Sequence, residues 1–195
     1  MRLDEFCGQY HVRRALEVAM AGQHSVLFIG SWTSQAGAFA AYAREKGLRA
    51  RAVAPCPCGN YNDSPGACTC SVEMVARWQA KHLGDRVQYD IYIEVPPDDL
   101  DHIMAKVSGR KKDEPEEAVS VRLCHMKHYT DCTLRPDGAE ASLLRTAIRQ
   151  LQLSYTQVRT ILSVARTIAN LAGSERIESV HLAEAVQYRK RNGGR

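Results

Sequence analysis

The chain has 195 residues, of which 45% are hydrophobic and 25% charged, the composition of an ordinary globular protein. No apolar run approaches the roughly 18 residues that a membrane span needs. Residues 1–6 lack the apolar stretch of a secretion signal. These features argue against a membrane partner and predict a cytoplasmic protein, in which cysteines stay reduced.

Positive charge is concentrated in the second half of the chain. Residues 120–195 hold 12 Lys and Arg against 6 Asp and Glu, whereas residues 1–119 hold 14 against 16, so balances of +6 and −2 make up the overall +4. A basic half of this kind suits phosphate backbones such as those of DNA. Helices also carry such charge as an ordinary solvated surface, and that interpretation is the commoner one.

The first half alternates helical patterns with short apolar runs. Helices are predicted over residues 9–22, 35–46 and 72–83, and strands over residues 25–29, 48–54 and 89–95. Ser71 is a predicted N-cap, and Gly47 a predicted helix stop. Because parallel strands need a crossover connection, the order strand, helix, strand predicts a βαβ unit in a sheet of about three parallel strands.

The second half is predicted to be entirely helical. Residues 108–117 are polar and charged and contain a proline, which is typical of a linker. Amphipathic patterns follow over residues 118–130, 137–150, 154–171 and 179–190, with Asp137 and Ser154 as N-caps of the second and third. The chain therefore divides into an α/β part, residues 1–107, and an all-α part, residues 118–195.

Four cysteines lie in the loop after the second strand. Cys56 and Cys58 form one C-x-C pair and Cys68 and Cys70 another, with nine residues between the pairs. Four thiolates close together suit a tetrahedral, structural zinc site. Paired C-x-x-C is the commoner zinc spacing, so free thiols and disulfides stay open as alternatives.

A second group of metal-binding residue types lies at helical spacing. Cys124, His128 and Cys132 fall at i, i+4 and i+8, which would place them on one face of a helix. A second metal site is one interpretation of this spacing. A packed helix face without metal is the commoner one.

Four blocks of the sequence resemble one known family. They are residues 8–30 (GQYHVRRALEVAMAGQHSVLFIG), 55–71 (PCPCGNYND, then CTCS), 90–97 (DIYIEVPP) and 163–189 (SVARTIANLAGSERIESVHLAEAVQYR). In this order they are similar to the magnesium-chelatase-like AAA+ ATPases, especially the competence-associated branch. The resemblance implies a short βαβ remnant of an AAA+ core that carries the cysteine-rich loop 55–71, followed by a helical lid domain. Family members form rings, and they act in magnesium insertion into a porphyrin or, in the competence-associated branch, on DNA.

The groups that bind and hydrolyse ATP in this family have no counterpart in this chain. A phosphate loop needs glycines, a lysine and a Ser or Thr, yet Gly30 is followed by Ser31 and Trp32, and no Gly-Lys-Ser/Thr occurs. The strand that ends in the magnesium-binding acids is absent too, as if a central stretch of the core were deleted. We therefore predict a degenerate member that does not use ATP and Mg²⁺ and has no catalytic residues.

Three further positions depart from the family pattern. The asparagine before the Pro-Cys-Pro-Cys segment, the arginine finger and the lid arginine align with Ala54, Gln88 and Thr156. An alignment shifted by a few residues offers Arg86 as the finger and Arg159 as the lid contact.

Three functional hypotheses follow from these features. The leading one is a non-catalytic family member, a zinc-stabilised interaction or nucleic-acid-associated module that docks on intact AAA+ family subunits or on DNA. The alternative is a divergent ATP-binding member that acts in DNA processing, during competence or recombination, or in metal chelation. The third is a decayed gene product without a selected role.

Overall fold

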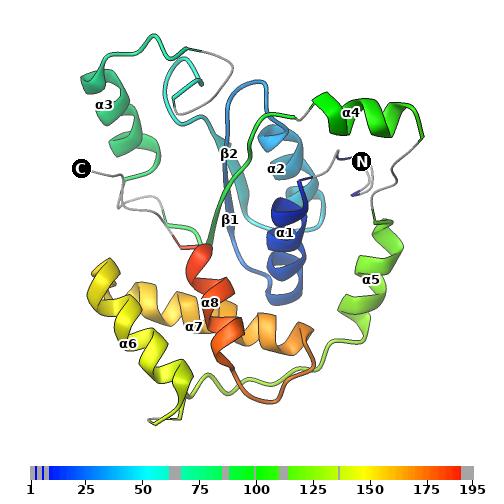
Figure 1. Cartoon of the computed structure of the whole chain (residues 1–195), viewed down its shortest axis with the longest axis vertical. Helices are drawn as coiled ribbons and strands as arrows, with labels where there is room; N and C mark the ends of the chain where they lie inside the picture. Colours follow the sequence, from blue (N-terminus) through cyan, green and yellow to red (C-terminus); the bar gives the residue numbers. More distant parts are fainter. Residues whose placement is uncertain are drawn as a thin grey trace.

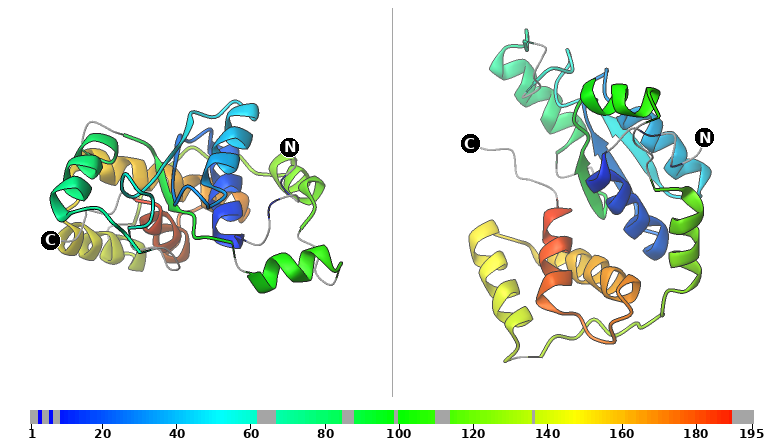
Figure 2. Two further views of the ribbon diagram at one scale, coloured as in Figure 1. Left: turned by 90° about the horizontal axis from the view of Figure 1, so that it is seen from above. Right: turned by 45° about the vertical axis from the view of Figure 1, so that its right-hand side comes forward.

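The computed structural model of the chain (Figures 1 and 2) describes residues 3, 6, 9–61, 67–84, 88–98, 100–109, 114–135 and 137–189. Its elements are α1 (Tyr10–Gly22), β1 (Val26–Ile29), α2 (Ala36–Glu45), β2 (Ala50–Val53), α3 (Val72–His82), β3 (Ile91–Glu94), α4 (Leu100–Val107), α5 (Glu116–Cys124), α6 (Ala139–Leu151), α7 (Tyr155–Leu171) and α8 (Ser179–Gln187). Every helix and strand predicted for the first half is confirmed, and the predicted order of an α/β part followed by helices is correct.

Three parallel strands form the sheet, in the order β2-β1-β3. Val26 of β1 lies opposite Ala50 on one side and Ile91 on the other. As the central strand, β1 buries Val26, Leu27 and Phe28. A strand covered on both faces requires such a continuous apolar run. The predicted sheet of three parallel strands is confirmed.

An aromatic cluster holds α2 against the sheet. Phe39 of α2 stacks with Phe28 of β1 at a ring-centroid distance of 5.9 Å, and with Phe6 at 4.0 Å. Tyr42, one turn further along α2, meets Phe6 edge-on at 5.9 Å. Stacked and edge-on ring pairs add to the free energy gained from burying apolar area, so these contacts fix α2 on the sheet.

Helix α1 joins the sheet to the helices of the second half. It packs against β3, α7 and α5. Its buried Glu17 accepts hydrogen bonds from Arg14 on the same helix, at 3.0 Å, and from Arg122 on α5, at 2.6 Å. Arg14 also donates to Glu184 on α8, at 2.9 Å. Two arginines thus neutralise the buried carboxylate and tie α1 to α5 and α8.

The two ends of the sheet carry different parts of the molecule. Helices α3 and α4 lie at the end where the strands finish, and α6, α7 and α8 lie at the end where the strands begin (Figure 1). Helix α8 packs on both α6 and α7. The backbone carbonyl of Tyr188, just after α8, accepts a hydrogen bond from the N–H of Tyr92 in β3, at 2.8 Å. This bond occupies a group that an edge strand would otherwise leave unpaired.

A buried arginine organises the helical part. Arg166 on α7 donates to one amide oxygen and three backbone carbonyls, those of Asn170 (3.1 Å), Asp131 (3.3 Å), Glu175 (2.9 Å) and Ser174 (2.6 Å). A guanidinium group has five N–H donors and no acceptor, so it suits a set of oxygen atoms. One side chain therefore holds the segment before α6 and the segment after α7 against α7.

The end of α5 differs from the prediction. The helix predicted over residues 118–130 begins at Glu116, inside the predicted linker, and ends at Cys124. Beyond it, the backbone N–H and carbonyl of Tyr129 bond to the side chain of Asn170 on α7, at 3.2 and 3.0 Å. These long-range bonds replace the helical ones. Residues 110–113 of the linker lie outside the described residues.

One N-cap prediction is wrong and two are correct. Ser71 and Ser154 cap α3 and α7 with their hydroxyl groups, as predicted. The N-cap of α6 is Gly138 and not Asp137. The side chain of Glu140 folds back over this helix start, so that a Cβ atom on Gly138 would lie 2.2 Å from its carboxylate oxygen. The pKa of the Glu140 carboxyl lies below its usual value, mainly because the backbone N–H of Glu140 bonds to it and also because Arg135 does.

Helix α4 was not predicted from the sequence. Leu100, Ile103, Met104 and Val107 follow helical spacing, but two prolines before them and a charged segment after them favour a loop. Three of these four side chains are exposed, so packing contributes little to this helix.

Among the described residues, no helix combines the length and the apolar character needed to cross a bilayer.

Replacing Arg166 with methionine should lower the free energy of unfolding by about 3 kcal/mol, because several buried oxygens lose a charged donor at once. Urea unfolding followed by circular dichroism measures this loss. Arg159→Met on the same helix is the matched control, since Arg159 is exposed, and it should change the stability by less than about 0.5 kcal/mol. Equal losses in the two variants would show that Arg166 has no special role.

Candidate metal centre and its surroundings

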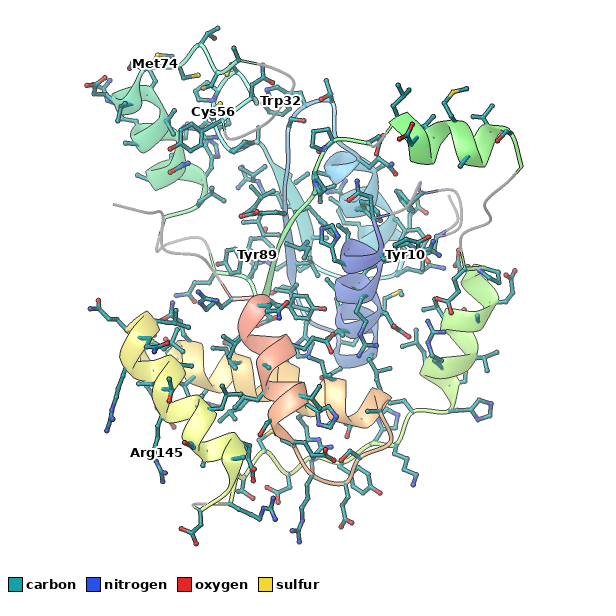
Figure 3. The ribbon with its side chains drawn as sticks, in the orientation of Figure 1. Tyr10, Trp32, Cys56, Met74, Tyr89 and Arg145 are labelled. Carbon is teal, nitrogen blue, oxygen red and sulfur yellow. The ribbon has the colours of Figure 1, made fainter. Side chains whose placement is uncertain are left out.

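The cysteine loop, residues 55–71, lies at the end of the sheet where the strands finish. It follows β2 and leads into α3, and residues 62–66 within it lie outside the described residues. Figure 3 shows Cys56 in this region, near Trp32 and Met74. The carboxyl ends of parallel strands are the usual place for a binding site in an open α/β sheet.

The four sulfur atoms are close enough to bind one ion. All four lie within 4.8 Å of one another. The Sγ atom of Cys56 lies 3.3 Å from that of Cys58 and 3.8 Å from that of Cys68, and the Cys58 and Cys68 sulfurs are 3.6 Å apart. A tetrahedral zinc ion with Zn–S bonds of about 2.3 Å holds its sulfurs about 3.8 Å apart. The donor set therefore fits zinc.

Backbone N–H groups favour negative charge on the sulfurs. Those of Asn60 and Thr69, with a further bond from Cys56, lower the pKa of the Cys58 thiol to about 5. The N–H of Cys58 acts on Cys70 in the same direction, but burial and the neighbouring sulfurs outweigh it and raise the pKa of Cys70 to about 12. The Cys58 thiolate forms readily, and its negative charge opposes ionisation of the other thiols. A bound cation would neutralise this charge, so that all four thiols could ionise.

The start and the end of the cysteine loop are both fixed. The indole N–H of Trp78 on α3 donates to the carbonyl of Ala54, at 2.8 Å, and the Gln79 amide donates to the carbonyl of Pro55, at 3.3 Å. Ser71 caps α3 directly after the last cysteine. Helix α3 is thus bound to the end of β2, and the cysteines lie between these two attachments.

Trp32 covers the first half of the cysteine loop. Its indole N–H donates to the carbonyl of Pro57, at 3.3 Å, while 65% of the residue is exposed. Gly59 beneath it has a φ of +88°, and a Cβ atom there would lie 2.4 Å from the Trp32 ring. Only glycine satisfies both conditions. The segment that follows β1 is therefore packed against the cysteine loop.

The polar groups of the segment after β1 bind one another. The hydroxyls of Ser31 and Thr33 are 2.9 Å apart, and the hydroxyl of Ser34 donates to the carbonyl of Ser31 at 2.8 Å. The first N–H of α2, on Ala36, points to the Ser34 hydroxyl at 3.4 Å. These local bonds occupy the hydroxyls of the segment and the first N–H of α2, which would otherwise be available to an anion.

The other predicted site residues do not form a second site. Because α5 ends at Cys124, the proposed face with His128 and Cys132 does not exist, and the prediction that they share one helix is wrong. In the part of the chain that the structure describes, the four cysteines of the loop are the group of His, Cys, Asp and Glu side chains placed to hold a metal. Arg159 is exposed on α7, and Arg86 lies outside the described residues.

Three contributions to the site are not evident from the sequence: the backbone N–H groups of Asn60 and Thr69, and the contact of Gly59 with Trp32. The N–H groups of Asn60 and Thr69 act through the backbone, so their residue types carry no signal. Gly59 is recognisable as a turn residue, but its contact with Trp32 joins positions 27 residues apart in the chain. Such a contact leaves no mark on local spacing.

The sequence matches a known family over most of its length. The family described as "Magnesium chelatase, subunit ChlI" matches residues 2–42 and 40–103, more than half of the chain, and the one described as "Magnesium chelatase, subunit ChlI C-terminal" matches residues 110–189. The chain belongs to the magnesium chelatase ChlI family, as the resemblance implied. The first match falls into two segments that meet at residues 40–42.

A curated relative comes from the competence-associated branch. Competence protein ComM of Haemophilus influenzae is 29% identical to this chain in an alignment of 154 residues that covers 71% of this chain and 30% of ComM. The chain thus spans less than a third of the length of this relative.

Purified protein should contain about one zinc ion per chain, because four sulfurs complete a tetrahedral site. Cys58→Ser and Cys68→Ser should each lose most of this zinc, as measured by plasma mass spectrometry. Cys124→Ser, at an exposed position outside the cluster, is the matched control and should keep it. Chelation of the zinc should also change the fluorescence of Trp32 and Trp78, since both contact this region. Zinc well below one per chain in the unmodified protein would rule the site out.

Proposed function

We propose that this chain is a non-catalytic member of its family, in which a zinc-bound cysteine loop stabilises a surface for a partner. The contact between Trp32 and the cysteine loop carries the proposal. Phosphate binding requires bare backbone to wrap the phosphates and a lysine beside it. In this chain a tryptophan ring lies on Gly59 at that point of the fold, and the neighbouring hydroxyls bond to one another.

The absence of key charged groups supports the same conclusion. Phosphoryl transfer depends on positioning and on neutralising the charge of the phosphates. The sequence from Gly30 to Gln35 contains no lysine or arginine, and no Gly-Lys-Ser/Thr occurs in the chain. A nucleotide there would therefore lack the groups that lower the barrier to hydrolysis.

A metal at the cysteine loop would compensate for a small sheet. Three strands of four residues each bury little apolar surface. Binding of zinc to preformed sulfurs contributes to the free energy of folding, because the unfolded chain has no such site. The zinc in this proposal is structural, and the four cysteine sulfurs are its ligands.

Exposed apolar side chains near the cysteine loop support a role in protein binding. Trp32, Val72 and Met74 are exposed there, and Figure 3 shows Trp32 and Met74 on either side of Cys56. Exposed apolar side chains that gather on one part of a protein mark an interaction surface. We propose intact subunits of the same family as the partner.

Exposed arginines on α6 support DNA as a second candidate partner. Arg145 and Arg149 are one helical turn apart and both are exposed, and Figure 3 shows Arg145 directed away from the body of the molecule. Basic side chains spaced in this way suit phosphate groups. The similarity to a competence protein agrees with a role on DNA during competence.

A nucleotide-binding assay tests the loss of the ATP site. A fluorescent ATP analogue with Mg²⁺ should show no saturable binding at micromolar concentrations, and no phosphate should be released from ATP. Trp32→Gly, which clears the ring from the cysteine loop, should also fail to hydrolyse ATP, because the lysine is still missing. Micromolar binding that Ser34→Ala abolishes would support the alternative of a divergent ATP-binding family member in DNA processing or metal chelation.

A salt titration separates the two candidate partners. If DNA is bound, its affinity should fall with salt, and Arg145→Gln with Arg149→Gln should reduce the slope of log K against log salt by about 2. Arg77→Gln with Lys81→Gln is the matched control, an exposed basic pair at the same spacing on α3. Absence of DNA binding at low salt would exclude DNA. Failure to copurify with an intact family subunit from the same cell would exclude the protein partner.

A further inference from the structure

Two sulfurs of the cysteine loop are placed to form a bond with each other. Cys58 and Cys68 belong to different C-x-C pairs, both are partly exposed, and their Sγ atoms are 3.6 Å apart. A disulfide bond is about 2.05 Å long, so a closing movement of about 1.5 Å forms it. Residues 67–70 belong to no helix or strand, so this movement disrupts no regular structure.

We propose that the cysteine loop is an oxidation site for hydroperoxides, at which a Cys58–Cys68 disulfide forms and the metal is released. The inference rests on the metal centre proposed above and adds its regulation. Cys56 has a sulfur 3.3 Å from that of Cys58, but it is buried. A peroxide in solution therefore reaches Cys58, Cys68 and Cys70 before Cys56, and of these three Cys58 and Cys68 have the sulfurs 3.6 Å apart.

The reaction balances with one hydroperoxide per disulfide. The Cys58 thiolate attacks the outer peroxide oxygen, the O–O bond breaks, and the leaving alkoxide or hydroxide takes a proton from water, which leaves a sulfenic acid on Cys58. The Cys68 sulfur then attacks the Cys58 sulfur as a thiolate, the S–O bond breaks, and hydroxide leaves with a second proton as water. The two sulfurs together lose two electrons, and the peroxide gains them.

The disulfide removes two of the four ligands from the metal. A structural zinc site needs all four, so the ion is no longer held. Both neighbours of the loop respond, because Trp32 lies on Gly59 and Trp78 binds the carbonyl of Ala54. Oxidation therefore alters the surface that carries the exposed apolar side chains, and a reductant restores it.

The experiment uses the full chain with Cys7, Cys124 and Cys132 replaced by serine, so that only the loop cysteines remain. The zinc-loaded protein is treated with hydrogen peroxide, released zinc is measured with a chromogenic indicator, and disulfides are mapped by peptide mass spectrometry after free thiols are alkylated. We expect one zinc released per Cys58–Cys68 disulfide. Dithiothreitol with added zinc should restore both the metal and the tryptophan fluorescence.

Each other result rejects a specific part of the proposal. Zinc that stays bound at peroxide concentrations sufficient to oxidise a free thiol rejects the oxidation site but leaves the metal centre intact. Zinc release with a Cys56–Cys58 disulfide rejects the assignment of the reacting pair. Absence of zinc from the untreated protein rejects the metal centre itself, and with it the inference.

Discussion

The carboxylate of Glu17 is buried at the junction between the sheet and the helices of the second half, and its charge must be neutralised there. Arg14 supplies one donor from the same helix and Arg122 supplies the other from α5. Because a buried charge without partners is strongly destabilising, this carboxylate requires α1 and α5 to stay together. Helix α1 also packs on β3 and α7, so the arrangement of both halves depends on its position.

The opposite end of the sheet is held by different means. There the loop after β2 carries four cysteines, its first residues bind α3 through Trp78 and Gln79, and Trp32 covers it from the segment after β1. In the family that this chain belongs to, the segment after the first strand is expected to wrap phosphates. Here the same part of the fold makes contacts within the protein. The proposed role as a non-catalytic partner-binding module follows from this replacement of phosphate binding by contacts within the protein.

Much of this protein follows from local patterns. The apolar run of residues 25–29 gives the buried central strand, and alternation in residues 89–95 gives β3. Ser71 and Ser154 were recognisable as N-caps from their hydroxyl groups and their positions, because such a cap bonds to an N–H only three residues away. The two C-x-C pairs indicated a sulfur site before any distance was known. In each case the pattern that supports the prediction lies within a short stretch of the chain.

The sequence by itself therefore determined the order of the elements, the parallel sheet and the ligand set of the candidate metal centre. The tertiary structure alone decided that α5 stops at Cys124, since Asn170 on α7 takes over the backbone groups of Tyr129. It also decided the meeting of Trp32 with Gly59, and the separation of Cys124 from His128 and Cys132 that follows from the end of α5. The physical reason is the range of the interactions, because spacing records bonds within a helix or strand but not contacts between distant segments.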